Sequence, residues 1–295
     1  MKQWVILSGK GGTGKTTVAA ALAHLAAQEH RLVMADADVD AANLELVLSP
    51  TVAETHDFVG SKVAFIDPSR CTGCGTCVQT CRFEAVSAGD SICRVDPIAC
   101  EGCAACFYRC PAEAITMVDQ LGGRWFRSDT NLGPLFHARL FAGQENSGKL
   151  VTQVKQSARL LAVKSGSDLL LVDGPPGIGC PVIAATTGAD LALLVVEPSV
   201  SGVHDLERIL ATTRHFSVPA VVCVNKADVS AARTAEIGSV CAREGVPLVG
   251  CIPFSETVIR AMVHRQPVTE YCPGAVTEAL HAVWRDMQCY LERRP

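Results

Sequence analysis

Eight of the 15 cysteines fall into two runs that share one spacing. Both runs read C-x2-C-x2-C-x3-C, and they consist of Cys71, Cys74, Cys77 and Cys81, followed by Cys100, Cys103, Cys106 and Cys110. The second run lies 29 residues after the first, and the flanking Asp67-Pro68 recurs at the same offset as Asp96-Pro97. Three thiolates on one tight loop can each bind an iron of an iron–sulfur cube. The spacing therefore predicts two metal centres built on an internal repeat.

A structural zinc site or a disulfide framework is the alternative explanation for these cysteines. Zinc sites usually draw on two separated cysteine pairs rather than on a doubled run of four. Disulfide frameworks are typical of secreted chains, whereas cysteines in a reducing compartment more often bind metals. Small residues between the thiols let backbone amides approach inorganic sulfide, and they are Gly73, Gly75, Gly102 and Ala104. We therefore interpret the two runs as iron–sulfur ligands.

Residues 59–122 resemble a bacterial two-cluster ferredoxin over their whole length. In such ferredoxins the fourth cysteine of each run binds the other cluster. The resemblance thus implies one [4Fe–4S] cluster on Cys71, Cys74, Cys77 and Cys110, and a second on Cys100, Cys103, Cys106 and Cys81. Pro111 follows the second run as it does in these ferredoxins, whereas Arg82 follows the first. We expect that departure to alter the loop more than the ligation.

A second stretch with evident chemistry is Gly9–Thr17, which reads GKGGTGKTT and contains the pattern G-x4-G-K-[ST]. An apolar run precedes it and an alanine-rich run follows it, which is the strand–loop–helix order of a phosphate loop. Its glycines allow successive N–H groups to point at phosphate oxygens. Lys15 would reach the β- and γ-phosphates, and Thr16 would offer its hydroxyl to Mg²⁺. The expected nucleotide contacts are Gly11, Gly12, Thr13, Gly14, Lys15, Thr16 and Thr17.

Lys10, near the start of this loop, is a second lysine in the motif. The segment Lys10–Thr16 resembles the deviant Walker A motif of the MinD/ParA/Mrp ATPases and of the nitrogenase iron protein. In that superfamily this lysine crosses a two-fold interface to the partner's nucleotide. The resemblance implies a homodimer that forms on ATP binding, with Lys10 and Lys15 acting in catalysis.

Acidic residues end two of the predicted strands. Leu32–Ala35 is followed by Asp36 and Asp38, and Leu169–Val172 is followed by Asp173. Taken alone, the first pair would be an ordinary acidic loop. The family resemblance implies that Asp38 orients the attacking water, that Asp36 lies near magnesium, and that Asp173 binds Mg²⁺. It also implies nucleotide contacts for Asn43 in switch I and for the Gly177 amide in switch II.

The remaining expected contacts lie near the nucleotide base. The resemblance assigns Asn225 to the adenine edge and Pro253 to the segment that covers the base. Asn225-Lys226-Ala227-Asp228 also fits the N-K-x-D pattern with which small GTPases read guanine. We expect ATP, as in the family, and GTP is the alternative. Cys180 resembles a cluster ligand of the nitrogenase iron protein, but a small buried residue is the simpler interpretation.

The elements that must position these residues are short. Apolar runs such as Leu169–Val172 and Leu191–Val196 suit strands buried on both faces. The 295 residues are 48% hydrophobic and 19% charged, which excludes a disordered chain. We expect an α/β fold, a mostly parallel sheet of the P-loop NTPase type with an inserted small α+β ferredoxin-like domain. The predicted domains are 1–56 and 124–295 for the ATPase, and 57–123 for the insert.

Charge and hydropathy limit the expected partners. The formal net charge is −4 and no long basic run occurs, so we expect no nucleic-acid partner. Mean hydropathy is +0.25, yet there is no run of about 18 apolar residues, so we expect no membrane partner. Met1-Lys2-Gln3 leads directly into an apolar, strand-like run without the pattern of a leader peptide, and we expect a cytoplasmic protein.

Together these motifs predict a dimeric switch that binds Mg-ATP, hydrolyses it to ADP and carries two [4Fe–4S] clusters. The combination is similar to Mrp and to the orange-protein-complex ATPases of anaerobes. The closely spaced clusters favour electron transfer to a partner protein or metal cofactor. The alternative is an ATP-dependent factor that assembles, carries or positions metal clusters. The C-terminal C-x-x-C pair of Mrp-type carriers is missing from the sequence, which disfavours one form of that alternative.

Overall fold

The structure, a computed structural model, describes residues 1–141 and 147–292. The described residues divide into two compact units. The first consists of Met1–Thr55, Trp125–Arg139 and the chain from Ser147 onward, and the second consists of His56–Arg124 with Leu140 and Phe141. Each unit has its own hydrophobic core.

The first unit is built on a sheet whose strands follow the order β11-β10-β9-β1-β8-β2-β7-β6-β3. Its central strands are β1 (Lys2–Ser8), β2 (Leu32–Asp36), β7 (Gly133–Leu140), β8 (Leu169–Pro176), β9 (Leu191–Val196), β10 (Ala220–Asn225) and β11 (Leu248–Ile252). Strand β1 pairs in parallel with β8 and β9, β2 with β7 and β8, and β10 with β9 and β11. The mostly parallel α/β sheet predicted from the sequence is therefore confirmed.

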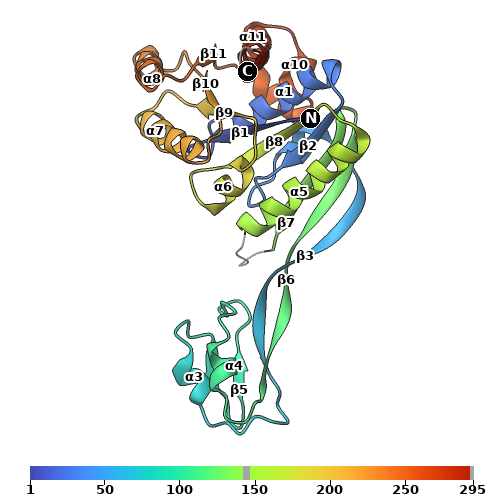
Figure 1. Cartoon of the computed structure of the whole chain (residues 1–295), viewed down its shortest axis with the longest axis vertical. Coiled ribbons are helices and arrows are strands. Elements are labelled where there is room, and N and C mark those ends of the chain that lie inside the picture. The colour runs from blue at the N-terminus through green and yellow to red at the C-terminus, as the bar shows by residue number, and fades with distance from the viewer. Residues whose placement is uncertain (142–146, 293–295) are drawn as a thin grey trace. The chain divides into compact units, whose positions relative to one another are not determined.

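Helices cover both faces of this sheet, with α1, α10 and α11 on one side and α5, α6 and α7 on the other (Figure 1). The helices of this unit are α1 (Lys15–Glu29), α2 (Leu44–Leu48), α5 (Ser147–Ser165), α6 (Cys180–Thr186), α7 (Val200–His215), α8 (Ala231–Glu244), α9 (Glu256–Val263), α10 (Val268–Tyr271) and α11 (Ala275–Glu292). Because both faces are covered, every residue of β9 is buried, as its unbroken apolar sequence predicts.

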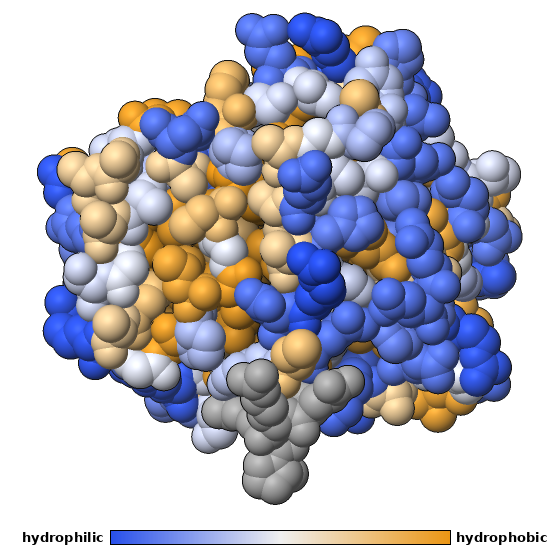
Figure 2. Space-filling model, turned by 90° about the horizontal axis from the view of Figure 1, so that it is seen from above, coloured by the Kyte–Doolittle hydropathy of each residue, from blue (hydrophilic) through white to orange (hydrophobic). Residues whose placement is uncertain are grey.

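Figure 2 shows the face of the molecule seen from above, where hydrophilic residues cover much of the surface and hydrophobic residues gather left of the centre. Over the described ranges 1–141 and 147–292, none of the helices combines the length and the apolar character that crossing a bilayer requires.

The second unit holds both cysteine runs. Its helices α3 (Thr76–Thr80) and α4 (Ala105–Arg109) each follow the first cysteines of a run, and β4 (Val86–Ala88) pairs antiparallel with β5 (Cys93–Val95). The long strands β3 (Thr51–Ile66) and β6 (Ile115–Thr130) are neighbours in the sheet. Strand β3 ends in the second unit, and β6 begins there. Cross-strand contacts join Lys62 to Asp119, Ser61 to Gln120, Asp57 to Arg124 and Glu54 to Arg127. Each pair of residue numbers has the same sum, which is the register of an antiparallel pair.

The sequence repeat is also a structural repeat. The Asp67 amide donates to the Ala114 carbonyl, and 29 residues on, the Asp96 amide donates to the Ala85 carbonyl, both at 2.8 Å. In each contact an aspartate of one repeat pairs with an alanine of the other repeat. An approximate two-fold axis that exchanges the two repeats relates the two contacts. Backbone conformation repeats too, because Glu84 and Glu113 both adopt positive φ, at 55° and 47°.

Candidate functional site

The phosphate loop connects β1 to α1 in the first unit. Gly14 precedes α1 with a left-handed backbone, at φ 87°, and a Cβ there would lie 2.2 Å from the Asn225 Nδ2 atom. Only glycine satisfies both conditions. The loop lines a cleft that opens to solvent. The predicted phosphate and magnesium residues on its wall are Gly11, Gly12, Thr13, Gly14, Lys15, Thr16, Thr17, Asp38 and Asn43.

Lys15 is buried among carboxylates at the floor of this cleft. Its Nζ donates to Asp173 Oδ1 at 2.7 Å and lies 3.5 Å from Asp38 Oδ2. Burial alone lowers the pKa of the Lys15 ammonium, but the surrounding carboxylates, Asp173 first, outweigh that effect and raise it. The lysine is therefore charged and held in place, ready to meet the still more negative charge of a phosphate.

Asp36 lies beside Asp173 because the two residues are register partners on β2 and β8. Asp36 is fully buried and accepts hydrogen bonds from the backbone N–H groups of Asp38 (3.1 Å) and Leu44 (2.9 Å). Burial, together with the neighbouring charge of Asp173, raises the pKa of Asp36 to about 8. A buried carboxyl group whose charged form is disfavoured, next to a second carboxylate, is the kind of group that a bound cation stabilises.

The donor set fits a magnesium ion. Asp173 Oδ2 is buried and has no hydrogen-bond partner. Thr16, whose hydroxyl the sequence predicts as a ligand, lines the adjoining cleft. Carboxylate and hydroxyl oxygens beside bound phosphates are the ligands that Mg²⁺ prefers, so Asp173 and Thr16 would hold the ion, with Asp36 behind them. Bound Mg²⁺ would neutralise charge on the phosphates.

The two predicted switch residues are placed differently. Asn43 lines the cleft and directly precedes α2. Gly177 does not belong to the described lining of the cleft, and its N–H donates to the Ser8 carbonyl at 2.9 Å. The preceding Pro175 and Pro176 line the cleft in its place, and the sequence did not single them out. A phosphate contact from the Gly177 amide would thus require this hydrogen bond to break.

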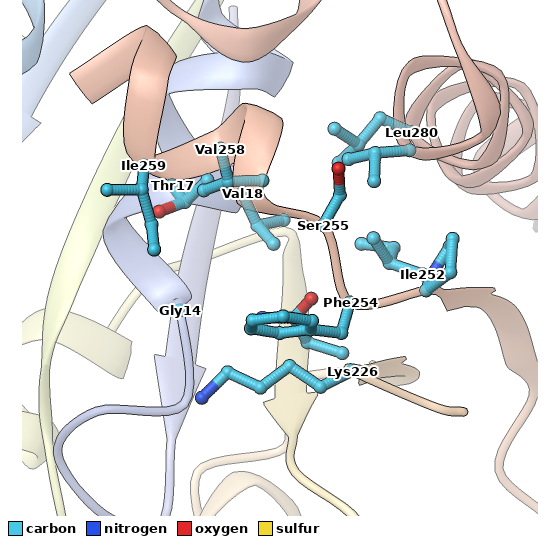
Figure 3. Close-up of a pocket in the computed structure, with 13 residues that line it drawn as sticks. Gly14, Thr17, Val18, Lys226, Ile252, Phe254, Ser255, Val258, Ile259 and Leu280 are labelled. Atoms are coloured by element: carbon cyan, nitrogen blue, oxygen red, sulfur yellow. The ribbon is translucent and has the colours of Figure 1, made fainter. Parts of the chain in front are cut away.

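A second, more apolar pocket adjoins the loop at Gly14 and Thr17. Asn225 and Pro253, the predicted base residues, both line it. Figure 3 shows Phe254 and Lys226 on one side of this pocket and Val18 and Ile259 on another. An apolar slot next to a phosphate loop suits the flat face of a purine.

The N-K-x-D segment holds this region together. Asn225 Nδ2 donates to the Thr13 carbonyl at 2.7 Å, and Lys226 Nζ donates to the Gly12 carbonyl at 3.3 Å. Asp228, the residue that would read guanine, is not among the described residues that line the pocket. Its Oδ1 accepts the Phe254 N–H at 2.7 Å instead.

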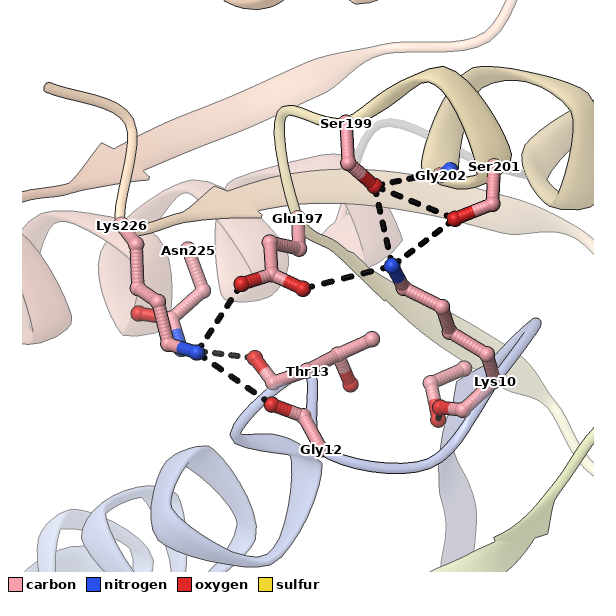
Figure 4. A network of polar contacts seen from close by, with 10 residues as sticks. Lys10, Gly12, Thr13, Glu197, Ser199, Ser201, Gly202, Asn225 and Lys226 are labelled. Carbon is pink, nitrogen blue, oxygen red and sulfur yellow. Dashed lines mark hydrogen bonds and ion pairs between the residues drawn. The ribbon is translucent and has the colours of Figure 1, made fainter. Parts of the chain in front are cut away.

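Lys10 is bound by its own chain. Its Nζ donates to the hydroxyls of Ser199 and Ser201, both at 2.9 Å, and lies 3.4 Å from Glu197 Oε2 (Figure 4). The other Glu197 oxygen lies 3.0 Å from Lys226 Nζ, so one carboxylate joins both lysines. The family resemblance implies a role for Lys10 across a dimer interface, but it does not indicate these partners, which lie about 190 residues away in the sequence.

The predicted ligands of the first cluster lie around one cavity in the second unit. Cys71, Cys74 and Cys77 of the first run and Cys110 of the second run line one small cavity. Cys93, outside both runs, lines it as well. Aligning the repeat with itself would have drawn attention to Cys93, because its counterpart 29 residues earlier is Ala64.

Three of the four predicted ligands of the second cluster, Cys100, Cys103 and Cys106, lie close together. Burial raises the pKa of the Cys106 thiol, and the nearby thiols of Cys100 and Cys103 raise it further. Cys81 and Cys100 pack against the same small core as Cys106. All 15 cysteines are free. Cys180 begins α6 and is exposed, so the interpretation of this cysteine as a small buried residue is wrong.

Neither group of thiols is arranged around a single ion. Over residues 1–141 and 147–292, no set of three or more His, Cys, Asp or Glu side chains converges closely enough to hold one metal ion. In an iron–sulfur cube each thiolate binds a different iron, so its ligands surround a larger body. Four of the predicted ligands line one cavity.

Comparison with known proteins identifies the family. The model of the CobQ/CobB/MinD/ParA nucleotide-binding domain matches residues 4–268. An uncharacterised protein of Methanocaldococcus jannaschii is 36% identical over 221 residues, which cover 75% of this chain and 76% of that protein. The septum site-determining protein MinD of Neisseria meningitidis is 24% identical over 290 residues, which cover 93% and 86% of the two chains.

Solved structures share the fold. The cell division ATPase MinD of Pyrococcus furiosus superposes with a TM-score of 0.58 at 18% identity, covering 98% of this chain and 99% of that one. An ATP complex of a McdA variant from Cyanothece gives a TM-score of 0.59 at 20% identity, covering 98% and 96%. With the phosphate loop, the buried lysine and the acidic strand ends in place, the chain belongs to the CobQ/CobB/MinD/ParA family of nucleotide-binding domains and is, as predicted, a P-loop ATPase.

Proposed function

We propose that the chain is a dimeric Mg-ATP switch whose inserted residues 57–123 form a two-[4Fe–4S] ferredoxin domain between the ATPase parts 1–56 and 124–295. Its nucleotide state would control electron transfer from the clusters to a partner protein or metal cofactor. The observation that carries the proposal is the cavity lined by Cys71, Cys74, Cys77 and Cys110. Cys110 comes from the other run, as the two-cluster ligand pattern requires.

The nucleotide half of the proposal rests on the cleft. Lys15, Thr16 and Asp173 supply a cation for phosphate, a hydroxyl and an unpartnered carboxylate oxygen for Mg²⁺. Asp38 stands 3.5 Å from Lys15 Nζ, where its carboxylate can accept a hydrogen bond from an attacking water. The apolar base pocket without Asp228 in its described lining supports ATP over GTP.

A second candidate function is an ATP-dependent positioning or cluster-carrying factor. The observation that favours it is the group of relatives named septum site-determining protein MinD, at 24% identity. In that case the clusters would be structural or cargo, and their redox state would not respond to nucleotide. A cytoplasmic, reducing location suits both candidates.

The test begins with anaerobic purification or reconstitution. We expect about eight irons per chain, the content of two [4Fe–4S] clusters, and EPR signals after reduction with dithionite. Adding Mg-ATP should shift those signals or their midpoint potentials. Lys15→Ala lacks the ammonium group that binds the phosphates, so this variant should show no shift. Cys71→Ser should lose one cluster, and Cys180→Ser should serve as the matched control with both clusters intact.

The outcomes separate the candidates. A chain that takes up no iron contradicts the ferredoxin domain itself. Clusters that form but are redox-silent, or that ignore both nucleotide and partner, contradict the electron-transfer role and leave the positioning role. Clusters that respond to Mg-ATP in the wild type but not in Lys15→Ala support the proposal.

A further inference from the structure

The cavity lined by the first-cluster cysteines contains one thiol more than a cluster needs. Cys93, on β5, is 3% exposed and lines this cavity together with Cys71, Cys74, Cys77 and Cys110. A [4Fe–4S] cluster has four irons and takes four thiolates. The fifth thiol therefore has no ligand role in the predicted assignment.

Cys93 lies beside one predicted ligand. The side chains of Cys93 and Cys77 line the same cavity and belong to the same buried core. A thiol is a weak hydrogen-bond donor, and a metal-bound thiolate is an acceptor. When Cys77 is bound to iron, its sulfur carries no proton. A hydrogen bond between the two side chains can then run only from the Cys93 S–H group to the Cys77 sulfur.

The two-fold repeat shows where the same position lies at the other cluster. A Cβ on Gly73 would meet the Ser91 carbonyl, and a Cβ on Gly102 would meet the Lys62 carbonyl. Ser91 and Lys62 are 29 residues apart, as Gly73 and Gly102 are. The segment before each cysteine run therefore packs against the loop of the other run. The same exchange relates Cys77 to Cys106 and Cys93 to Ala64. Ala64 is therefore the residue that occupies, next to Cys106, the position that Cys93 occupies next to Cys77.

The two cluster positions thus differ at one buried residue. Ala64 is 4% exposed and lies in the same core as Cys93, but its methyl group has nothing to donate. Hydrogen bonds to the sulfurs are one of the factors that set the potential of an iron–sulfur cluster. A donor stabilises the more negative, reduced form and so raises the reduction potential.

We propose that Cys93 tunes the first cluster by donating an S–H hydrogen bond to the Cys77 sulfur, so that the two clusters differ in reduction potential and the first is the easier to reduce. This inference rests on the proposed function, since it requires both clusters. The redox step is the uptake of one electron by each cluster, and the Cys93 proton stays on its sulfur throughout. Because of this difference in potential, an electron on the protein would reside mainly on the first cluster, the one bound by Cys77.

The experiment is a redox titration of the full-length, reconstituted protein by EPR, with iron content measured in parallel. Cys93→Ala makes position 93 like its counterpart, Cys93→Ser keeps a donor, and Ala64→Cys adds a thiol on the other side. Cys223→Ala, which removes a buried cysteine from the nucleotide-binding unit, is the matched control.

In Cys93→Ala we expect one midpoint to become more negative while the other stays. The reduced-to-oxidised ratio of that cluster at the wild-type midpoint should fall by up to about tenfold, which is about 59 mV for a one-electron couple. Cys93→Ser should restore part of the shift, and Ala64→Cys should raise the other midpoint. Cys223→Ala should leave both midpoints unchanged.

Three results would overturn the inference. If the midpoint potentials stay unchanged both in Cys93→Ala and in Ala64→Cys, the tuning role is excluded. If Cys93→Ala fails to fold, an unchanged midpoint in Ala64→Cys is enough to exclude it. Iron content that falls by half in Cys93→Ala makes Cys93 a ligand instead. A wild-type protein without iron removes the proposed function and this inference with it, whereas the first two results leave the proposed function standing.

Discussion

Lys10 carries the most specific expectation for a single residue, and the structure shows what holds it in one chain. Two hydroxyls and the Glu197 carboxylate surround its ammonium group. A lysine that reaches a partner's nucleotide must leave all three contacts. In the proposed dimer the strength of this network would enter the free energy of dimerisation, so weakening it should favour the dimer.

Glu197→Gln should increase ATP-dependent dimerisation. The variant keeps the shape of the side chain but removes the charge that lies 3.4 Å from Lys10 Nζ. A partly exposed ion pair contributes about 0.2–1 kcal/mol, so we expect the dimer to form about 1.4- to fivefold more tightly with Mg-ATP. Sedimentation velocity measures this directly. Glu207→Gln, which removes a carboxylate paired with Arg243, is the control, and equal affinities for wild type and Glu197→Gln would falsify the idea that the network restrains Lys10.

Asp173→Asn should uncouple magnesium from the nucleotide site. The wild-type carboxylate pairs with Lys15 through one oxygen and keeps its buried second oxygen without a partner. An amide cannot offer two anionic oxygens, so the additional rise in Tm that Mg²⁺ gives to the ADP-bound protein should disappear. Loss of the buried ion pair should also lower the free energy of unfolding, by about 3 kcal/mol. Thermal melts with ADP, with and without Mg²⁺, test both effects, with the exposed Asp168→Asn as the control.

At the scale of elements, α2 is joined to both the magnesium site and the edge of the sheet. Its first residue, Leu44, donates its N–H to Asp36. Its second, Glu45, lies 2.5 Å from Arg139 Nη2 and 2.9 Å from the buried His137 Nδ1 on β7, although the latter contact lacks hydrogen-bond alignment. A change at the magnesium site that moves α2 must therefore change the surroundings of His137.

His137 should make the first unit sensitive to mild acid. Burial lowers the pKa of His137 below 6.5, and Arg139 lowers it further, whereas Glu45 opposes them and the neutral Ser128 hydroxyl meets the other ring nitrogen. Below pH 6.5 the unfolded chain then binds a proton that the folded protein does not, so stability falls as the pH falls toward the folded pKa.

The measurement is the change in Tm between pH 7.5 and 5.5. We expect His137→Gln to show a smaller drop than the wild type, because the variant has no proton to gain on unfolding at this position. His204→Gln, at an exposed histidine, should behave like the wild type. If His137→Gln loses as much stability on acidification as the wild type, another group is responsible for the acid sensitivity.

The sequence predicts the elements whose pattern is local. The phosphate loop, its flanking strand and helix, and the acids at the ends of β2 and β8 are encoded in short runs, and the structure forms them. The long strands β3 and β6 were not predicted, because many of their residues are exposed and they lack an apolar pattern of either period. The partners of Lys10 and the position of Cys93 beside Cys77 depend on tertiary packing, which local pattern does not report.

At the scale of the whole molecule, the two units differ in what their cores are made of. The first unit has a large aliphatic core on one face of its sheet. The core of the second consists of Ala64, Ile66, Cys77, Val86, Cys93, Cys106 and Ile115, so cysteine sulfurs make up much of it. A module of this size needs additional cross-links to be stable, and the proposed clusters would supply them.

Removing the clusters should therefore unfold the second unit and leave the first intact. The double variant Cys77→Ser/Cys106→Ser removes one predicted ligand of each cluster. We expect residues 57–123 to become sensitive to protease and to exchange amide hydrogens rapidly, while the Kd for Mg-ADP stays within about twofold, since the first unit keeps its own core. The exposed pair Cys180→Ser/Cys289→Ser is the control. Lost nucleotide binding in the first double variant would show that the units depend on each other for folding.

The paired strands β3 and β6 give the insert a property of a different kind. Contacts of one register run from Glu54 and Arg127 to Lys62 and Asp119, so the chain leaves and returns on adjacent strands. Cutting both strands at residues 56 and 125 and joining them with an Asn-Gly turn would leave an ordinary hairpin on the ATPase. The same junction would then offer a place where another small domain could be joined, provided that its two ends leave on a hairpin.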